Sequence, residues 1–255
     1  MKILLVITKA EIGGAQAFVL TLAKGLKDNG HQVSVASGVG NFLPIELKKE
    51  NIPYFHLKSL KRSINPFIAI SFIFELKVLI NKEGFDVVHF NSTNVLTGIF
   101  SVKMSMYNPK TVFTVHGLSI IDSNYKASIL LKISFKVYFK FFTNYIDKIV
   151  FVSNYNLAEA TNQGIVKNGV VIYNGLEITK DYFLDRDSAR RELSKITGQD
   201  LTDAYLIGSI GRLAYPKNYE FLIKIWLEIK KIKLASTSHF LNIIILLYYF
   251  YYADL

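Results

Sequence analysis

The chain has 255 residues, enough for one large domain or two ordinary ones, and 51% of them are hydrophobic. Its 30 Lys and Arg residues exceed its 20 Asp and Glu residues. Electrostatics therefore favour anionic partners, which leaves nucleic acid, an anionic membrane surface and phosphorylated small molecules open. The absence of cysteine excludes disulfides and thiolate metal sites, and it fits a reducing compartment.

The N-terminal segment MKILLVITKAE is typical of a buried strand rather than of a signal peptide. Its apolar run is short, no small-residue cleavage site follows, and Lys9 and Glu11 interrupt it. No other segment reaches the roughly 18 uncharged apolar residues that a membrane-spanning helix needs. We therefore expect a cytoplasmic protein, which can still contact the inner face of the membrane peripherally.

Short apolar runs alternate along the chain with longer segments of helical periodicity. The expected strands are residues 2–8, 32–37, 52–57, 86–91, 111–116, 148–153, 170–174 and 205–211. Helices are expected between the first two strands and near residues 66–82, 94–106, 126–145, 154–163, 186–196 and 218–232. Most of the strands are continuously apolar, as parallel strands covered on both faces are. The alternation predicts an α/β fold with a doubly wound parallel sheet.

A change in composition after VVIYNGLE predicts a domain boundary. Residues 1–177 are expected to form a complete Rossmann-like domain, residues 178–203 a polar linker with one short exposed helix, and residues 204–231 the first strand–helix unit of a second domain. The remaining residues, 232–255, form a hydrophobic tail in which we see no helical or strand period. We interpret this tail as atypical, of the kind that a frameshift or an early stop would leave.

The loop TKAEIGGAQAF follows the first predicted strand and opens the first predicted helix. Gly13 and Gly14 lack a Cβ, so backbone N–H groups there can approach an anionic ligand at the positive end of the helix. A tight strand–helix turn explains the same residues. Since the pair is not the GxGxxG fingerprint and no acidic residue closes the second strand, an NAD-dependent oxidoreductase has weak support.

His116 follows a predicted strand in TVHGLS and precedes Gly117. Ligands in open α/β sheets bind beyond the carboxyl ends of the strands, so His116 is placed for a site, although a lone histidine is more often structural. For His89, in DVVHFNS, we expect packing and hydrogen bonding. Asn174 and Gly175 close the last strand of the first domain, where a turn alone explains an Asn-Gly pair.

The stretch LIGSIGRLAYPKNYEFL is predicted to be a strand, a glycine-containing bend and the start of a helix. Arg212 follows Gly211 in the bend, and Lys217 precedes the helix. Arginine offers a fixed fork of donors and lysine a mobile point charge, so the two together suit a diphosphate. Two solvent-facing charges on a loop are the alternative interpretation.

Lys132, Lys136 and Lys140 lie on one face of a predicted helix that is rich in Phe, Leu and Ile. The pattern could hold an anionic membrane surface, where each basic residue contributes about 1 kcal/mol. A solvated helix face shows the same pattern and is the more ordinary interpretation. No basic-aromatic motif of a nucleic-acid binder is present, so we expect no nucleic-acid partner.

Seven motifs, taken in order, resemble the retaining GT-B glycosyltransferases of family GT4: EIGGAQ, NGHQVSVAS, FDVVHFNS, TVHG, DKIVFVSN, VIYNGLE and IGRLAYPKNYEFLI. The resemblance covers roughly residues 1–230 and is specific in combination. It implies two Rossmann-like domains facing a cleft, with a nucleotide-sugar donor held mainly by the second domain. It also implies a glycan or lipid-linked acceptor and a role in bacterial surface polysaccharide synthesis.

The resemblance assigns catalytic roles to three residues. His116 matches the histidine that contacts the transferred sugar, and Arg212 and Lys217 match the pair that stabilises the departing diphosphate of a UDP- or GDP-sugar. Negative charge grows on the β-phosphate as the glycosidic bond breaks, so fixed cations there lower the barrier. The resemblance implies neither a cofactor nor a metal, and no Asp-x-Asp motif is present to hold one.

The resemblance also indicates binding positions. Gly13 and Gly14 match the glycine loop near the donor diphosphate or the acceptor. Asn174 and Gly211, which lie in two of the shared motifs, are grouped with them as donor- or acceptor-binding positions. Gln16 departs mildly from the family pattern, because glutamate is common after Gly-Gly-Ala.

One departure from the family is larger. The paired-glutamate motif and the nucleoside and sugar pocket of the family lie beyond the point where this chain becomes the hydrophobic tail. We therefore expect impaired transfer by the chain. The alternative is a non-catalytic fragment that binds acceptor or partner and is completed by a separate chain.

Overall fold

The computed structural model describes residues 1–63, 65–123, 125–175, 183–203, 205–211, 218–234 and 241–247. The chain divides into two compact units, Met1–Gly175 and Leu176–Leu255, called unit 1 and unit 2 below. Unit 1 contains a seven-stranded sheet and unit 2 a two-stranded sheet. The α/β fold class expected from the sequence is confirmed.

All strand pairs in the sheet of unit 1 are parallel, in the order β3-β2-β1-β4-β5-β6-β7. The strands are β1 Lys2–Ile7, β2 Gln32–Ser37, β3 Tyr54–His56, β4 Val87–Phe90, β5 Lys110–Val115, β6 Lys148–Phe151 and β7 Val170–Val171. From β1 the chain adds strands outward in one direction up to β3, then crosses back to β4 on the other side of β1. The order therefore reverses between β1 and β4, and a parallel α/β sheet binds ligands beyond the carboxyl ends of such a pair.

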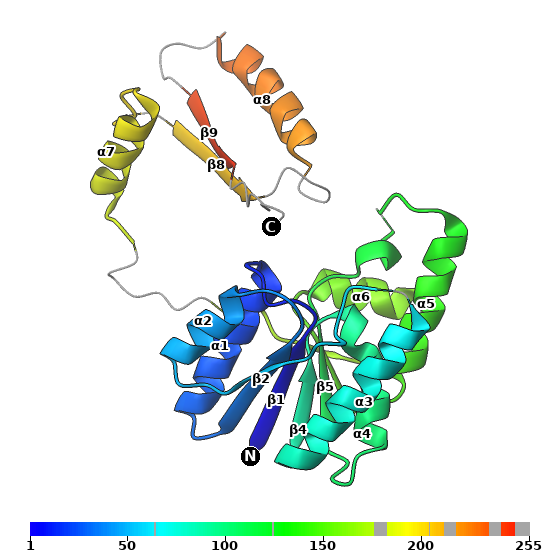
Figure 1. Cartoon of the computed structure of the whole chain (residues 1–255). Helices are drawn as coiled ribbons and strands as arrows, with labels where there is room; N and C mark the ends of the chain where they lie inside the picture. Colours follow the sequence, from blue (N-terminus) through cyan, green and yellow to red (C-terminus); the bar gives the residue numbers. More distant parts are fainter. Residues whose placement is uncertain are drawn as a thin grey trace. The chain divides into compact units, whose positions relative to one another are not determined.

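Helices cover both faces of this sheet. They are α1 Gly14–Asp28, α2 Phe42–Lys49, α3 Pro66–Glu83, α4 Ile99–Lys103, α5 Ile129–Thr143 and α6 Asn154–Asn162, with the short 3₁₀ helices η1 Thr93–Gly98 and η2 Ser119–Ile121. Figure 1 shows α1 and α2 on one side of the sheet and α3, α4 and α5 on the other. In the described part of the chain, none of the helices has both the length and the apolar run that crossing a membrane requires.

Alternating side chains of β1 explain why its sequence is continuously apolar. Ile3, Leu5 and Ile7 belong to the cluster that includes residues of α1 and α2. Leu4 and Val6 belong to the second cluster, which includes residues of α3, α4 and α5. Both sets of side chains are buried, as expected of a strand between two helical layers.

Three local features of unit 1 differ from the sequence expectation. Helix α2 was not expected; its Pro44 lies in the first turn, where proline is tolerated, and Leu43 and Leu47 bury one face. The helix expected over 94–106 is a 3₁₀ turn followed by the short helix α4. Strand β7 contains only Val170 and Val171, fewer residues than the expected 170–174.

Unit 2 begins its described part with α7, Arg186–Thr197, and continues with β8, Tyr205–Gly211, α8, Tyr219–Leu234, and β9, Leu241–Leu247. The Asp185 side chain accepts hydrogen bonds from the N–H groups of Asp187 and Ser188, which caps α7, and Gly198 ends it in the left-handed conformation. None of the residues of α7 is buried. The helix expected near residues 186–196 is therefore present.

The hydrophobic tail contains more structure than the sequence analysis expected. We saw no strand period after residue 232, but Leu241–Leu247 form β9, which pairs in parallel with β8 along all seven residues. A continuous apolar run has no alternation to detect, and a parallel strand covered on both faces needs none. The described part of unit 2 is therefore strand–helix–strand from β8 onward.

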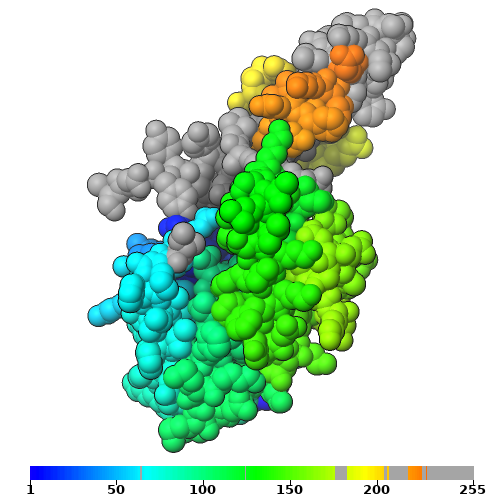
Figure 2. Space-filling model, turned by 90° about the vertical axis from the view of Figure 1, so that its right-hand side faces the viewer, coloured from blue at the N-terminus to red at the C-terminus, as the bar shows by residue number. Residues whose placement is uncertain are grey.

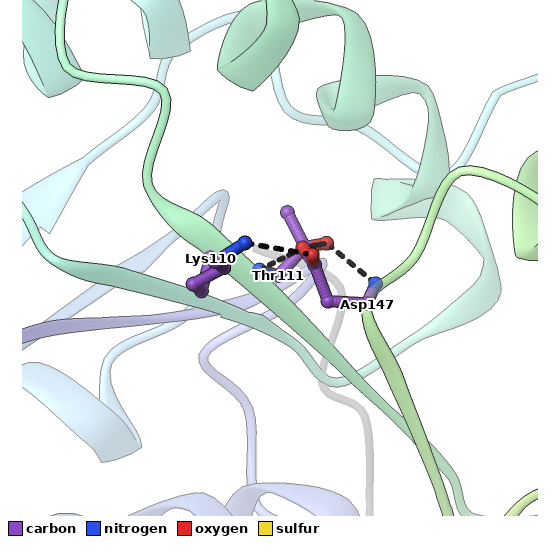
Figure 3. Close-up of polar contacts among 3 residues, drawn as sticks. All are labelled: Lys110, Thr111 and Asp147. Carbon is purple, nitrogen blue, oxygen red and sulfur yellow. Dashed lines mark hydrogen bonds and ion pairs between the residues drawn. The ribbon is translucent and has the colours of Figure 1, made fainter.

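Hydrogen bonds between Thr111 and Asp147 connect β5 and β6 at the amino ends of these strands (Figure 3). Asp147 Oδ2 accepts hydrogen bonds from Thr111 N at 2.8 Å and Thr111 Oγ1 at 2.7 Å, and Asp147 N donates to Thr111 Oγ1 at 3.0 Å. Lys110 Nζ lies 3.4 Å from Asp147 Oδ1. Because Thr111 is in β5 and Asp147 directly precedes β6, these bonds fix the register of the two strands.

Candidate functional site

A cleft of about 720 Å³ opens at the carboxyl ends of β1, β4 and β5. Its walls come from the segments that follow these strands, from the first turn of α1, from Arg62 and Ser63, and from Phe135 and Phe139 of α5. We call this feature the β1–β4–β5 cleft. It lies where the strand order reverses, which is the position that the topology favours for a ligand.

Close backbone packing fixes the loop after β1 against its neighbours. Thr8 N donates to Ser92 Oγ at 3.1 Å, and the two side-chain hydroxyls are 2.5 Å apart. A Cβ on Gly38 would lie 2.0 Å from the carbonyl oxygen of Leu60, so only glycine fits there. The loops after β1, β2 and β4 are therefore held together without help from a ligand.

The start of α1 borders the cleft. Gly13 is the N-cap in extended backbone conformation, and Gly14 is the first helical residue. The lining of the cleft includes their neighbours Ala15 and Gln16 but not the two glycines themselves. Gln16 Nε2 donates to the carbonyl of Lys9 at 3.0 Å, which ties the helix to the preceding loop. A Cβ on Gly14 would meet no heavy atom within 4 Å, so packing within the described residues does not require glycine there.

His116 directly follows β5 and lines the cleft. The ring of Phe18 meets its imidazole edge to face, with the ring centroids 4.8 Å apart. Burial lowers the pKa of His116 to about 4. The imidazole is therefore neutral near pH 7, where it offers one hydrogen-bond donor and one acceptor rather than a positive charge. The sequence-based placement of His116 at a strand end agrees with the structure; its catalytic role stays a prediction.

His89, in β4, is buried behind the cleft. Its Nε2 lies 2.7 Å from Thr114 Oγ1 in the neighbouring strand β5. Burial, followed by repulsion from any charge on His116, lowers the pKa of His89 to about 4. A packed and hydrogen-bonded histidine is what the sequence analysis expected at this position.

Asn91 is a candidate site residue that the sequence analysis did not single out. It lines the cleft, its side chain is fully buried, and its Nδ2 donates to the carbonyl of His89 at 3.0 Å. Two buried side-chain atoms at the cleft, Asn91 Oδ1 and His116 Nε2, have no hydrogen-bond partner among the described residues. A buried polar atom without a partner costs free energy, so each is a candidate contact for a ligand hydroxyl.

Four other predicted site residues lie outside the cleft or outside the described residues. Asn174 is exposed beyond β7 and is not part of the cleft lining. Gly211 is the last residue of β8 in unit 2. Arg212 and Lys217 lie outside the described residues. Within unit 1, the structure therefore brings His116 together with the residues next to Gly13 and Gly14.

The described residues contain no group of three or more His, Cys, Asp or Glu side chains that could hold a metal ion. The charged side chains that line the β1–β4–β5 cleft are Lys9 and Arg62, both basic. Lys9 Nζ forms an ion pair with Glu11 at 3.1 Å. Within the described ranges, the lining of the cleft therefore suits a neutral polar or anionic ligand better than a cation.

A profile of Glycosyltransferase Family 4 matches residues 12–180, which is more than half of the chain. The chain belongs to Glycosyltransferase Family 4. The matched residues include the start of α1, the strand-end segments that carry Asn91 and His116, and the Asn174–Gly175 pair. The family resemblance stated from the sequence motifs is confirmed at this level. No curated protein matches the chain.

Solved structures with a similar fold include a UDP-glucose complex and a galactosyltransferase. The Anabaena protein HepE in complex with UDP-glucose aligns with a TM-score of 0.66 and 16% identity, over 96% of this chain and 60% of that one. The lipopolysaccharide outer core galactosyltransferase WaaB aligns with a TM-score of 0.60 and 14% identity, over 96% of this chain and 60% of that one. The Family 4 chain thus spans less than two thirds of the length of either protein. At these identities the likeness concerns the fold alone.

The same fold also occurs in a protein with a different described reaction. A putative UDP-N-acetylglucosamine 2-epimerase from Listeria monocytogenes aligns with a TM-score of 0.55 and 13% identity, over 95% of this chain and 62% of that one. The fold therefore does not separate transfer from epimerisation, and a functional assignment of this Family 4 chain depends on the site.

Proposed function

We propose that the protein is a retaining glycosyltransferase that moves a sugar from a UDP- or GDP-sugar to a glycan or lipid-linked acceptor. Support comes from membership of Glycosyltransferase Family 4, and from fold neighbours that include a UDP-glucose complex and a lipopolysaccharide galactosyltransferase. In this proposal the protein works at the cytoplasmic side of the membrane, in the synthesis of a surface polysaccharide.

The observation that carries the proposal is the pair of unpartnered atoms at the β1–β4–β5 cleft. Asn91 Oδ1 can accept a hydrogen bond from a hydroxyl, and His116 Nε2 can accept or donate one, depending on the tautomer. The neutral imidazole suits a sugar better than a phosphate, because it brings no charge to the anion. We assign these two atoms to hydroxyl groups of the transferred sugar or of the acceptor.

The leaving diphosphate needs cations that neither Asn91 nor His116 supplies. We assign this role to Arg212 and Lys217, in the segment between β8 and α8. The bond between the anomeric carbon and the β-phosphate oxygen breaks while the acceptor oxygen bonds to the same face of that carbon, and the acceptor proton passes to the departing phosphate. Charge on the departing phosphate is then stabilised electrostatically; losing one such donor costs roughly 10²- to 10³-fold in kcat. Gly13, Gly14, Asn174 and Gly211 are proposed as binding positions.

The test is product analysis with purified protein, a panel of UDP- and GDP-sugars, and glycan and lipid-linked acceptors. We expect nucleotide release that depends on the acceptor, and a product with the anomeric configuration of the donor. Long incubations allow a slow rate to be detected. Inversion would contradict the retaining mechanism, and a C2-epimerised sugar nucleotide without transfer would assign the fold to the other reaction. His116→Asn and Arg212→Ala should both lower the rate of acceptor-dependent release, Arg212→Ala by roughly 10²- to 10³-fold.

A further inference from the structure

A second cavity, of about 320 Å³, lies beside the cleft between α3, η1 and α5. We call it the α3–α5 cavity. Figure 2 faces the side of unit 1 on which α5, in green, and α3, in cyan, lie next to each other. The apolar part of its lining comes from both helices and the segment before α3, and includes Leu60, Ile68, Ala69, Phe72, Leu131, Phe135 and Tyr138.

Two hydroxyl groups in the wall of this cavity are committed to the protein. Ser134 Oγ donates to the carbonyl of Leu130 at 2.9 Å, and Tyr138 Oη donates to the carbonyl of Thr93 at 3.3 Å. Burial raises the pKa of Tyr138 to about 12, as expected of a weakly hydrated environment. These two hydroxyl groups need no water as a partner, and the apolar side chains around them favour an apolar occupant.

The cavity and the β1–β4–β5 cleft are adjacent. Four residues line both: Ser63, Thr93, Asn94 and Phe135. A ligand in the cavity that passes between these four residues would reach the cleft that carries Asn91 and His116. One molecule with two chemically different ends can occupy both spaces.

Basic side chains lie where the two spaces meet. Lys61 lines the cavity and its neighbour Arg62 lines the cleft; both are exposed. No ion pair is recorded between either residue and an acidic side chain of the described ranges. Among the described residues that line the cavity, Lys61 is the only charged one. The order of these features matches an amphiphile with three parts. Its apolar chain would lie in the cavity, an anionic group at the two cations, and its polar end in the cleft.

Apolar side chains next in sequence to the cavity lining are exposed on both helices. The side chain of Leu131 lines the cavity and is 42% exposed, and the neighbouring Leu130 on α5 and Phe67 on α3 are each 76% exposed. Helix α5 contains no acidic residue. An apolar chain longer than the cavity can therefore leave it over a surface that remains apolar and is not repelled by acidic groups of α5.

We propose that the α3–α5 cavity binds the apolar chain of an amphiphilic acceptor, whose phosphate group lies at Lys61 and Arg62 and whose polar end reaches the cleft. The inference rests on the proposed function, since it names the chemical class of the acceptor. It adds a binding site that the family match and the structural likenesses do not identify.

The first experiment titrates the full chain with n-alkyl phosphates by calorimetry, below their critical micelle concentrations. We expect saturable binding with one site and an affinity that rises about fourfold per added methylene, the value for a fully buried CH₂ group. The rise should level off once the chain fills the cavity. Decanol and inorganic phosphate, which each carry half of the recognised chemistry, should bind at least about tenfold more weakly than decyl phosphate.

Filling the cavity tests its location. Ala69→Phe places a ring in the lining from α3, and we expect it to weaken decyl phosphate binding at least about tenfold. Ser71→Phe makes the same change in size at an exposed position of α3 that does not line the cavity, and binding should be unchanged. Ser134→Phe fills the cavity from α5. It is the substitute test if circular dichroism shows that Ala69→Phe is unfolded. Equal binding by the cavity-filling variant and Ser71→Phe would overturn the proposal.

Removing the cations tests the junction. The double variant Lys61→Gln with Arg62→Gln should weaken decyl phosphate binding while leaving decanol binding unchanged. Lys58→Gln, which is exposed and outside both linings, is the matched control. A third outcome would reject the cavity site. In that outcome the wild type shows no saturable binding of decyl phosphate, while phosphatidylglycerol vesicles bind both the wild type and Ala69→Phe. The exposed apolar surface would then be assigned to contact with a bilayer.

A separate titration with UDP-sugars distinguishes this inference from the proposed function. Ala69→Phe should bind UDP-sugar as the wild type does, because Ala69 does not line the cleft. If decyl phosphate binds as expected and no sugar nucleotide binds, the proposed function fails and the alkyl phosphate site stands. If a sugar nucleotide binds and decyl phosphate does not, the inference alone is overturned.

Discussion

At the scale of single residues, a substitution at Gly14 can distinguish a role in ligand binding from a role in packing. Gly14→Ala adds a methyl group that meets no heavy atom within 4 Å, at a position inside α1. We expect the unfolding free energy to stay equal or rise by up to about 1 kcal/mol, because alanine favours the helix. If backbone N–H groups there bind donor or acceptor, turnover should fall at least about tenfold. Unchanged turnover would leave the turn as the sole role of the glycine pair.

Gly38→Ala is the contrasting change and should affect stability. The new Cβ would lie 2.0 Å from the carbonyl of Leu60 and 2.8 Å from that of Thr8, and neither backbone atom can move cheaply. We expect a loss of about 2 to 4 kcal/mol in the free energy of unfolding, measured by urea titration. A loss below about 1 kcal/mol would show that the loops after β1 and β2 are looser than the structure describes.

Asn91→Leu tests the unpartnered acceptor at the cleft. The change removes a buried carbonyl oxygen that has no partner among the described residues, but also the Nδ2 donor to the carbonyl of His89, so the unfolding free energy should fall by about 1 to 2 kcal/mol. The kcat/KM should fall about 10- to 100-fold, the equivalent of one or two lost hydrogen bonds to the substrate.

Ser101→Ala is the control for the asparagine. Ser101 is buried and donates to the carbonyl of Ile73 at 2.7 Å, away from the cleft. This variant should lose stability and keep its kcat/KM. If Asn91→Leu behaves in the same way, Asn91 has a structural role only.

The buried histidines predict an acid-sensitive fold. The pKa of His89 falls from 6.5 to about 4 on folding, so the unfolded chain binds more protons between these values. Its stabilising contribution is present above pH 6.5 and is lost as the pH falls towards 4, by on the order of 2 to 3 kcal/mol. Urea titrations at several pH values should show a shallower decline in His89→Gln than in the wild type. Parallel curves would contradict the lowered pKa.

The sequence predicted the position of His116 but not of Asn91. A histidine next to a glycine at a strand end stands out in TVHGLS. Asn91 follows β4 in the same way, but an asparagine after a strand is an ordinary turn residue. Its importance follows from full burial and an unpartnered oxygen, which depend on contacts between strands that are distant in the sequence.

At the scale of elements, the contact between β5 and the start of β6 gives a further prediction. Burial raises the pKa of Asp147, but hydrogen bonds from Thr111 and the charge of Lys110 outweigh it, so the net pKa is lowered. Asp147→Ala should cost about 1 to 2 kcal/mol of unfolding free energy at pH 7, since it leaves Thr111 N without this acceptor. The difference from the wild type should shrink as the pH falls below 3.8 and the carboxylate gains a proton.

Lys110→Ala separates the ion pair from the hydrogen bonds at the same place. The lysine side chain is 78% exposed, so its removal should cost less than about 0.5 kcal/mol. An equal loss in both variants would assign the stabilisation to charge rather than to the bonds of Thr111.

The elements of the fold were largely predictable because burial on both faces makes parallel strands visibly apolar. All eight expected strands are present, with β7 shorter than expected. Helix α2 was hidden by Pro44 and by its length of eight residues, which carries only two buried positions. Strand β9 was hidden because an apolar segment without alternation does not reveal its secondary structure.

At the scale of the whole molecule, the hydrophobic core of the described residues lies in unit 1. Both hydrophobic clusters lie within unit 1, and the last of their buried residues is Val166. We therefore expect a fragment of residues 1–175 to fold alone and to melt within about 5 °C of the corresponding transition of the full chain. Circular dichroism during heating measures this; an unfolded fragment would show that unit 1 depends on the rest of the chain.

The ends of the large sheet have a consequence for self-association. Its edge strands, β3 and β7, contain three and two residues, so each edge offers few free backbone groups to another chain. Short edge strands prevent the stacking that leads to fibrils. Despite a mean hydropathy of +0.27, concentrated solutions should therefore form no thioflavin-positive aggregates through this sheet while unit 1 remains folded.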